Sequence, residues 1–245
     1  MPERLDRLLV SRGLAATRAR ARDAVLRGTV RVGGTVVTRP GLTLAEDAAL
    51  AMDDPASPYV SRAALKLVAG LDAFGVDAGG THALDVGAST GGFTQVLLER
   101  GAARVTALDV GRGQLAPRLR ADPRVRVIEG LNARDLTAGH LEGAPGLVVA
   151  DVSFISLRLA LPPALDLAAR DARCVLLVKP QFEAGREAIG KGGIVAPDVA
   201  ERVAREMRDW LDALSGWRAD GLAPSPIMGG DGNREWLLGG RKDTA

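Results

Sequence analysis

Residues 83–93 read ALDVGASTGGF, a short apolar run that leads directly into a glycine-rich turn. The run is typical of a buried strand, and the continuation GGFTQVLLERG has the spacing of a helix. Glycines at such a turn let the backbone pass close beneath a ligand, at the point where the next helix begins. The stretch therefore predicts a strand, a turn and a helix at a ligand-binding edge.

Strand-like and helical segments continue to alternate after this point. Four more apolar runs follow, RVTALDV at 104–110, VRVIEG at 125–130, GLVVADV at 146–152 and CVLLVKP at 174–180. Helical patterns lie between several of them, and residues 197–216 have the pattern of a long amphipathic helix that starts at Pro197. The alternation predicts an α/β fold with a mostly parallel sheet and helices on both faces.

The glycine-rich turn has three interpretations: a purely structural connection, a dinucleotide-binding turn, or a site for S-adenosylmethionine. The dinucleotide pattern G-x-G-x-x-G is not met, because Ser89 stands where its middle glycine belongs. The second strand ends in Asp109, which lies 24 residues after Asp85. A carboxylate at that place can accept both ribose hydroxyls of an adenosine-type ligand.

The pattern D-x-G-x-x-x-G-G-F of residues 85–93 resembles the first motif of many methyltransferases that use S-adenosylmethionine. In such enzymes the segment after the third strand commonly holds the adenine, and here that segment is GLNARDL, residues 130–136. The resemblance favours S-adenosylmethionine as the cofactor. It implies a set of candidate cofactor-binding residues: Asp85, Gly87, Ser89, Gly91, Phe93, Asp109 and Asn132.

The first 50 residues carry nine arginines and five acidic residues, a net charge of +4, whereas the rest of the chain has a net charge of −2. This uneven distribution suggests an anionic partner for the N-terminal segment. Helix spacing appears before Gly13 and again between Thr17, its predicted cap, and Gly28. Period-two alternation around Gly33-Gly34 then predicts a hairpin.

Residues 3–50 resemble the alpha-L RNA-binding motif, which a small-subunit ribosomal protein and several RNA-modifying enzymes share. We therefore predict a small N-terminal α+β RNA-binding domain over residues 1–50, a linker over 51–59 and a main domain over 60–245. A glycine-rich loop near residues 185–193 is predicted to be a lid that contacts RNA phosphate, or else a flexible solvent loop. The candidate RNA-binding residues are Arg4, Arg7, Arg18, Arg20, Arg22, Arg62, Arg186 and Lys191.

Two charged residues stand at the ends of neighbouring strand patterns. Lys179 follows the apolar run VLLV, and Asp151 ends the preceding strand pattern. If those strands pair, the amine and the carboxylate meet at the ligand-binding edge, either for catalysis or as an ordinary salt bridge. The nearby string GREAIGKG resembles a nucleotide-binding phosphate loop. However, Gly192 replaces the hydroxyl residue that would hold magnesium, and no helix start follows, so we interpret the match as accidental.

Two further charged residues are predicted to face solvent when their own segments are considered alone. Lys66 points nearly opposite to the apolar stripe of its helix pattern, which consists of Ala64, Leu67, Val68, Leu71 and Phe74. Glu235, within GNREWLL, has the position of a surface residue on an amphipathic strand.

Taken in order, Lys66, Asp151, Lys179 and Glu235 resemble the Lys-Asp-Lys-Glu set of FtsJ-type RNA ribose 2'-O-methyltransferases. The strings SRAALKL, ADVSFISL, LLVKPQFEAGREAIGKGG and GNREWLL are still more similar to the TlyA family, often labelled hemolysin A, whose members join an alpha-L module to such a domain. The resemblance covers essentially the whole chain. It implies a Rossmann-like S-adenosylmethionine-dependent methyltransferase fold. It also implies methylation of the ribose 2'-hydroxyl of cytidine in small-subunit ribosomal RNA, with large-subunit RNA as a further target.

The chemistry of ribose methylation gives each of the four residues a hypothetical role. Lys179 deprotonates or orients the 2'-hydroxyl, because a partly desolvated lysine beside another lysine holds its proton less strongly. Asp151 aligns Lys179, Lys66 orients the ribose and weakens the hold of Lys179 on its proton, and Glu235 positions one of the lysines. Proximity of the hydroxyl and the methyl donor supplies much of the rate.

Other features of the sequence narrow the class of protein. No apolar run approaches the roughly 18 residues of a membrane span, and the N-terminus has no signal-peptide pattern. Cys174 is the single cysteine and is predicted to be buried, and neither histidine has metal-ligand spacing. We expect a cytoplasmic enzyme that acts on ribosomal RNA within ribosomal subunits, with no membrane partner and no bound metal. No pattern of the sequence fixes the oligomeric state, and none requires more than a monomer. The alternatives are a non-catalytic ribosome assembly factor and a membrane-lytic hemolysin.

Overall fold

The computed structural model describes residues 2–243, except for the side chain of Arg186. These residues form two compact units that divide between Pro58 and Tyr59. Each unit has its own buried core, so the two are described separately.

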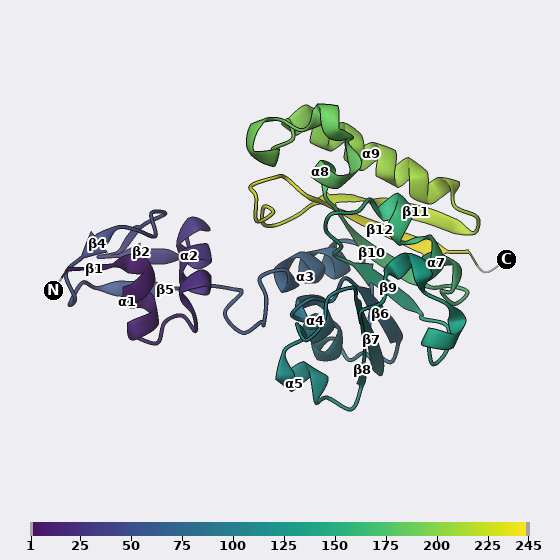
Figure 1. Ribbon diagram of the computed structural model, residues 1–245, viewed down its shortest axis with the longest axis horizontal. Coiled ribbons are helices and arrows are strands. Elements are labelled where there is room, and N and C mark those ends of the chain that lie inside the picture. Colours follow the sequence, from purple (N-terminus) through teal and green to yellow (C-terminus); the bar gives the residue numbers. More distant parts are fainter. Residues whose placement is uncertain (1, 244–245) are drawn as a thin grey trace. The chain divides into compact units, whose positions relative to one another are not determined.

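The larger unit is built on a seven-stranded sheet with the order β11-β12-β10-β9-β6-β7-β8 (Figure 1). The five strands predicted from apolar runs are confirmed, and they run parallel to one another. The structure adds β12, antiparallel to β10, and β11, antiparallel to β12. The strands are β6 His82–Val86, β7 Arg104–Asp109, β8 Val125–Glu129, β9 Leu147–Ala150, β10 Arg173–Val178, β11 Trp217–Pro224 and β12 Trp236–Lys242.

The strand order reverses direction at β6. From β6 the chain adds β7 and β8 on one side, and then returns to add β9 and β10 on the other. Connections that leave neighbouring strands in opposite directions open a crevice at their carboxyl ends, where α/β sheets bind ligands. The glycine-rich turn after β6 and the strand-end residues Asp109 and Asp151 therefore lie at one edge of the sheet.

Helices cover both faces of this sheet, as the alternation of segments predicts (Figure 1). Leu147 and Val149 of β9 face the core that includes α3 and α4, whereas Val148 and Ala150 face the core that includes α6, α7 and α9. Pro197 occupies the first turn of α9, as predicted. The helices are α3 Ala64–Ala73, α4 Gly92–Glu99, α5 Pro117–Arg120, α6 Leu157–Ala160, α7 Pro162–Asp166, α8 Pro180–Glu183 and α9 Pro197–Ala213, with 3-10 turns Ala133–Asp135, Ala138–His140, Arg186–Ala188 and Lys191–Gly193.

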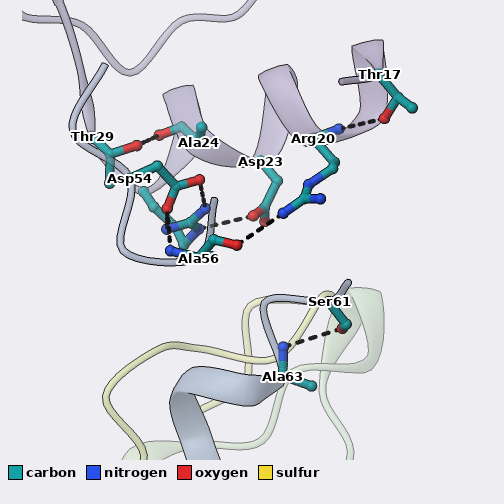
Figure 2. Close-up of polar contacts among 10 residues, drawn as sticks. Thr17, Arg20, Asp23, Ala24, Thr29, Asp54, Ala56, Ser61 and Ala63 are labelled. Carbon is teal, nitrogen blue, oxygen red and sulfur yellow. Dashed lines mark hydrogen bonds and ion pairs between the residues drawn. The ribbon is translucent and has the colours of Figure 1, made fainter. Parts of the chain in front are cut away.

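The smaller unit contains the two helices and the hairpin that the sequence predicts. Thr17 caps the second helix, where its hydroxyl oxygen accepts the backbone N–H of Arg20 at 3.3 Å (Figure 2). The structure adds three short strands that the sequence pattern did not predict, because runs of two or three residues carry no measurable period. The elements are β1 Glu3–Arg4, α1 Leu5–Ser11, α2 Arg18–Leu26, β2 Val30–Val32, β3 Thr35–Val36, β4 Thr43–Leu44 and β5 Leu50–Met52.

The segment predicted to be a linker is shorter than residues 51–59. Residues 51 and 52 belong to β5, because Met52 pairs with Val30 and extends the small sheet. Beyond β5, the carboxylate of Asp54 holds the guanidinium of Arg27 at the end of α2 through two hydrogen bonds of 2.8 Å. Asp54 also accepts the backbone N–H of Ala56 (Figure 2). These bonds attach the segment after β5 to the smaller unit.

The bidentate pair between Arg27 and Asp54 predicts the effect of one substitution. Asp54→Ala should destabilise the smaller unit by about 1.5–3 kcal/mol, because it removes two charge-assisted hydrogen bonds and leaves the largely buried guanidinium of Arg27 with Asp23 as its remaining ion-pair partner. In the full chain, hydrogen exchange of the amides of β2 and β5 should become roughly 10- to 100-fold faster. Asp47→Ala, at an exposed position, is the control. Equal exchange rates in both variants would contradict the stabilising role of the pair.

Candidate active site

The backbone of the glycine-rich turn brings two strand ends into close contact. A Cβ atom at Gly87 would lie 2.6 Å from the carbonyl oxygen of Asp151, and Gly87 has a φ of +86°. Only glycine fits this position, because the close approach and the left-handed conformation both exclude a side chain. Ser89 also has a positive φ, +48°, and its backbone N–H donates to Asp109 Oδ2 at 2.8 Å. The turn is thus held against both β7 and β9.

A cavity of about 870 Å³ opens beside this turn. Its wall comes from the carboxyl ends of β6, β7 and β9 and from the segment after β8, and it includes Gly87, Ser89, Asp109, Asn132 and Asp151. This volume lies within the range of cofactor pockets. The Asp109 carboxylate already accepts the N–H groups of Ser89 and Gly111, which fixes its orientation at the cavity wall.

Three other predicted cofactor-binding residues lie elsewhere. Phe93 borders a smaller neighbouring cavity of about 160 Å³, together with Lys179. Gly91 does not line either cavity; a Cβ there would meet the side chain of Leu119. Asp85 is fully buried beneath the turn, where it accepts the hydroxyl of Thr94 at 2.6 Å. Burial raises the pKa of Asp85 to about 7. Asp85 therefore supports the turn from below.

The lysine and carboxylate predicted at neighbouring strand ends meet, because β9 and β10 are paired and parallel. Lys179 Nζ lies 2.6 Å from Asp151 Oδ1 and donates a hydrogen bond of 2.7 Å to Ser153 Oγ. Lys179 is buried, and Asp151 lines the large cavity. Sequence patterns did not identify Ser153. Its position two residues after Asp151, in the same strand-end loop, is the one signal that points to it.

The prediction that Lys66 and Glu235 face solvent is wrong. Both are buried, with 5% and 4% of their surface exposed, and their side chains form an ion pair. The helix spacing gave the wrong face at Lys66. The face of α3 that contacts β10 and β12 is the buried one, and it includes Lys66 and Gly70. Val68 and Phe74, which were predicted to be buried, are partly exposed. Glu235 precedes β12, and burial raises its pKa while Lys66 opposes that shift.

A third cavity, of about 450 Å³, adjoins the first two. Lys179 and Glu235 lie in its wall beside the aromatic rings of Phe154 and Phe182, whose centroids are 5.3 Å apart. All four members of the predicted Lys-Asp-Lys-Glu set are thus brought together: Asp151 and Lys179 border the cavities, and Lys66 lies behind Glu235.

The predicted RNA-binding arginines of the smaller unit have different surroundings. Arg4 and Arg18 both contact the buried carboxylate of Asp6 while about half of each side chain stays exposed. Arg7 and Arg22 are exposed. Arg20 donates to the carbonyl oxygen of Ala56 at 2.8 Å (Figure 2). It also donates to that of Ser57. Four of the five guanidinium groups therefore keep surface for an anionic ligand, and that of Arg20 is engaged by the protein.

The remaining candidates belong to the larger unit. Arg62 is half-buried, Lys191 is exposed, and the side chain of Arg186 lies outside the described residues. The glycine-rich loop that carries Lys191 is tied to the segment before β12 by Asn233. This buried side chain accepts the N–H of Val195 at 2.8 Å and donates to the carbonyl oxygen of Gly193 at 2.9 Å. The loop is therefore anchored at its C-terminal end.

Within residues 2–243, no helix is both apolar enough and long enough to cross a bilayer. The same residues contain no group of three or more histidine, cysteine or acidic side chains arranged to hold a metal ion.

Comparison with known proteins identifies relatives over the whole chain. The sequence pattern of the S4 domain matches residues 3–49, and that of the FtsJ-like methyltransferase matches residues 59–242. The 16S/23S rRNA (cytidine-2'-O)-methyltransferase TlyA of Mycobacterium tuberculosis is 47% identical over 98% of this chain and 90% of its own length. Hemolysin A of Brachyspira hyodysenteriae is 38% identical over 96% of this chain and 98% of its own. A solved structure of a "putative hemolysin" from Streptococcus thermophilus has a TM-score of 0.77 at 40% identity, and the match covers 100% of this chain and 90% of that one.

The buried ion pair predicts a non-additive pattern of stability. Lys66→Met or Glu235→Gln alone should lower the free energy of unfolding by about 3–5 kcal/mol, because each leaves one buried charge unpaired. The double variant should lose less than the sum of the two, because neither charge of the pair remains to be left without its partner. Urea unfolding of the wild type and three variants measures this. Strictly additive losses would mean that the two charges do not interact.

The buried carboxyl of Asp85 predicts a pH dependence of stability. Its pKa of about 7 lies above the ordinary value of 3.8, so folding favours its protonated form. The resulting stabilisation is complete below about pH 4 and is lost as the pH rises through 7, at most about 4 kcal/mol in total. Asp85→Asn should flatten this slope between pH 4 and pH 7 in urea unfolding. Asp135→Asn, at an exposed position, should keep it. A wild-type slope retained in Asp85→Asn would refute the assignment.

Proposed function

The chain belongs to the TlyA family of FtsJ-like methyltransferases, and from this premise we propose that it methylates the ribose 2'-hydroxyl of cytidine in ribosomal RNA. The small-subunit RNA is the first candidate substrate, and the large-subunit RNA is the second, since the Mycobacterium relative is named for both. The observation that carries the proposal is the Lys179–Asp151 pair at the carboxyl edge of the sheet, beside a cavity of cofactor size.

The residues around the large cavity fit S-adenosylmethionine. Gly87 and Ser89 of the turn line the cavity wall, and Asp109 and Asn132 provide polar groups from β7 and from the segment after β8. Carboxylate oxygens suit ribose hydroxyls, and the apolar wall beside Asn132, with Leu131 and Ala133, suits a purine. When bound, this cofactor supplies an electrophilic methyl group.

Each member of the charged set has a distinct task in the proposed reaction. Lys179 accepts the proton of the 2'-hydroxyl or directs that hydroxyl by a hydrogen bond, and Asp151 holds the amine of Lys179 in place. Lys66 and Glu235 neutralise one another at the back of the third cavity. Their pair fixes the Glu235 carboxylate, which orients the ribose or the neighbouring Lys179. This last role differs from the sequence-based hypothesis, in which Lys66 itself orients the ribose.

Substrate binding is assigned to both units. The half-exposed arginines of the smaller unit, such as Arg4 and Arg18, contact phosphates of folded ribosomal RNA. Lys191 and Arg186 of the larger unit contact the RNA backbone near the modified nucleotide. Because contacts with the backbone carry little base information, we expect assembled subunits to be better substrates than naked RNA. The reaction takes place in the cytoplasm, where such subunits are found.

A methyl-transfer assay tests this proposal. Labelled S-adenosylmethionine is incubated with purified, unmodified ribosomal subunits and with naked ribosomal RNA, and the labelled nucleoside is identified after digestion. The wild type should form 2'-O-methylcytidine. Lys179→Ala should lose about 10²–10⁴-fold in turnover while it still binds the cofactor, because proton transfer is removed and binding is not. Arg205→Ala, an exposed cation on α9, should keep full activity.

Three results would contradict the proposal or one of its parts. Absence of transfer to any of the RNA substrates, with RNA and cofactor still bound, would favour a ribosome assembly factor. Near-normal turnover of Lys179→Ala would remove Lys179 from the reaction. Leakage of liposomes caused by the purified protein would support the hemolysin alternative instead.

A further inference from the structure

Lys179 has a second polar partner outside the charged set. Its amine contacts both Asp151 and Ser153, but only the contact with Ser153 Oγ, at 2.7 Å, has the geometry of a hydrogen bond. The contact with Asp151 is Coulombic and therefore nearly independent of the direction of the N–H bonds. A charge holds the amine nearby, whereas an aligned hydrogen bond sets which way its donors point.

Ser153 stands where the three cavities meet. Of the residues that the structure describes, it alone borders the large cavity, the small cavity and the third cavity. Lys179 borders the small and third cavities, and Asp151 the large and small ones. A methyl donor in the first cavity and a ribose near Lys179 and Glu235 would thus have Ser153 between them.

The loop that carries Ser153 is held from both ends. At its start the N–H of Asp151 donates to the carbonyl oxygen of Val86 at 3.0 Å. At its end the carboxylate of Glu183 accepts the Ser156 hydroxyl at 2.5 Å and the N–H of Leu157 at 2.7 Å. Glu183 lies in α8, directly after Lys179, so the clamp joins the serine loop to the segment that follows the lysine.

The backbone within the loop is also unusual. Phe154 has a φ of +64°, a conformation that costs energy for a residue with a side chain. The Glu183 clamp holds the loop in this turn, and the turn keeps the exposed Ser153 directed at the buried amine of Lys179. A serine with no role beyond its exposure on the surface would require neither the hydrogen bonds to Glu183 nor the positive φ of Phe154.

We propose that Ser153 is a positioning residue that aims the Lys179 amine at the ribose 2'-hydroxyl. A lysine side chain ends in three N–H donors or, when neutral, two N–H donors and a lone pair. Ser153 takes one donor and Asp151 supplies the charge that holds the amine, which leaves another position of the nitrogen for the substrate hydroxyl. This inference rests on the proposed function, because it assigns a role within that reaction.

Steady-state methyl transfer by Ser153 variants tests the inference. Ser153→Ala should lower kcat about 10- to 100-fold, because the amine loses its direction, while KM for ribosomal subunits and the Kd of S-adenosylmethionine stay within about twofold. Ser153→Thr, which restores a hydroxyl, should recover most of kcat. Ser215→Ala, an exposed serine on the same unit, should match the wild type. Thermal unfolding of all variants should agree, because Ser153 is exposed.

The outcomes separate this inference from the proposed function. A wild type without methyl transfer refutes the function itself. An active wild type with an equally active Ser153→Ala overturns only the role of Ser153. The role is also overturned if Ser153→Ala weakens cofactor binding tenfold in proportion to kcat, or if Ser153→Thr is as impaired as Ser153→Ala, since the hydroxyl would then not be the group that matters.

Discussion

The close approach of Gly87 to the carbonyl oxygen of Asp151 is the constraint on which the rest of the site depends. At this position a single Cβ atom would come within 2.6 Å of the neighbouring backbone. Because none is present, the turn after β6 lies directly against the loop after β9. The floor of the cofactor cavity and the Asp151 carboxylate that contacts Lys179 are therefore parts of one contact between two backbones. Chemistry that needs donor and acceptor in line gains from such a short, rigid separation.

Two ion pairs lie near the contact between Gly87 and Asp151, and they differ in how deeply they are buried. Lys179 and Asp151 lie at the ends of paired strands and border cavities, so substrate can reach them. Lys66 and Glu235 are more deeply buried and come from segments that are 169 residues apart in the sequence. A buried pair seldom adds net stability compared with apolar side chains of the same size. Its value here is positional, because it fixes α3 and the segment before β12 beside the amine of Lys179.

The sequence pattern was sufficient to predict the strands of the sheet, but it was insufficient to predict which side chains contact one another inside the site. Apolar runs located five parallel strands, because buried strands are continuous in sequence and need no partner to be recognised. Helix spacing predicted that Lys66 faces solvent, because the spacing compares only the apolar content of the faces of one helix. It cannot take into account that Glu235, from a distant segment, pairs with Lys66 in the folded chain. Family resemblance named both residues as a set, and the hypothesis had Glu235 position one of the two lysines without indicating which one. Ser153 has no pattern of its own, and its role depends on a turn at Phe154 and a carboxylate at Glu183. Those contacts exist only after folding.

The smaller unit also uses buried charged groups in its packing. Its buried apolar cluster is small, so charged groups take part in its packing. The carboxylate of Asp6 is buried, and hydrogen bonds from Arg4 and Arg18 lower its pKa to about 2, so it is ionised at neutral pH. The two arginines thereby lose much of their conformational freedom during folding, while about half of each side chain stays exposed. An RNA phosphate that binds there contacts guanidinium groups that are already ordered. These two arginines therefore lose less conformational entropy on binding than flexible surface arginines would. The interaction that stabilises this unit therefore also prepares its surface for an anionic partner.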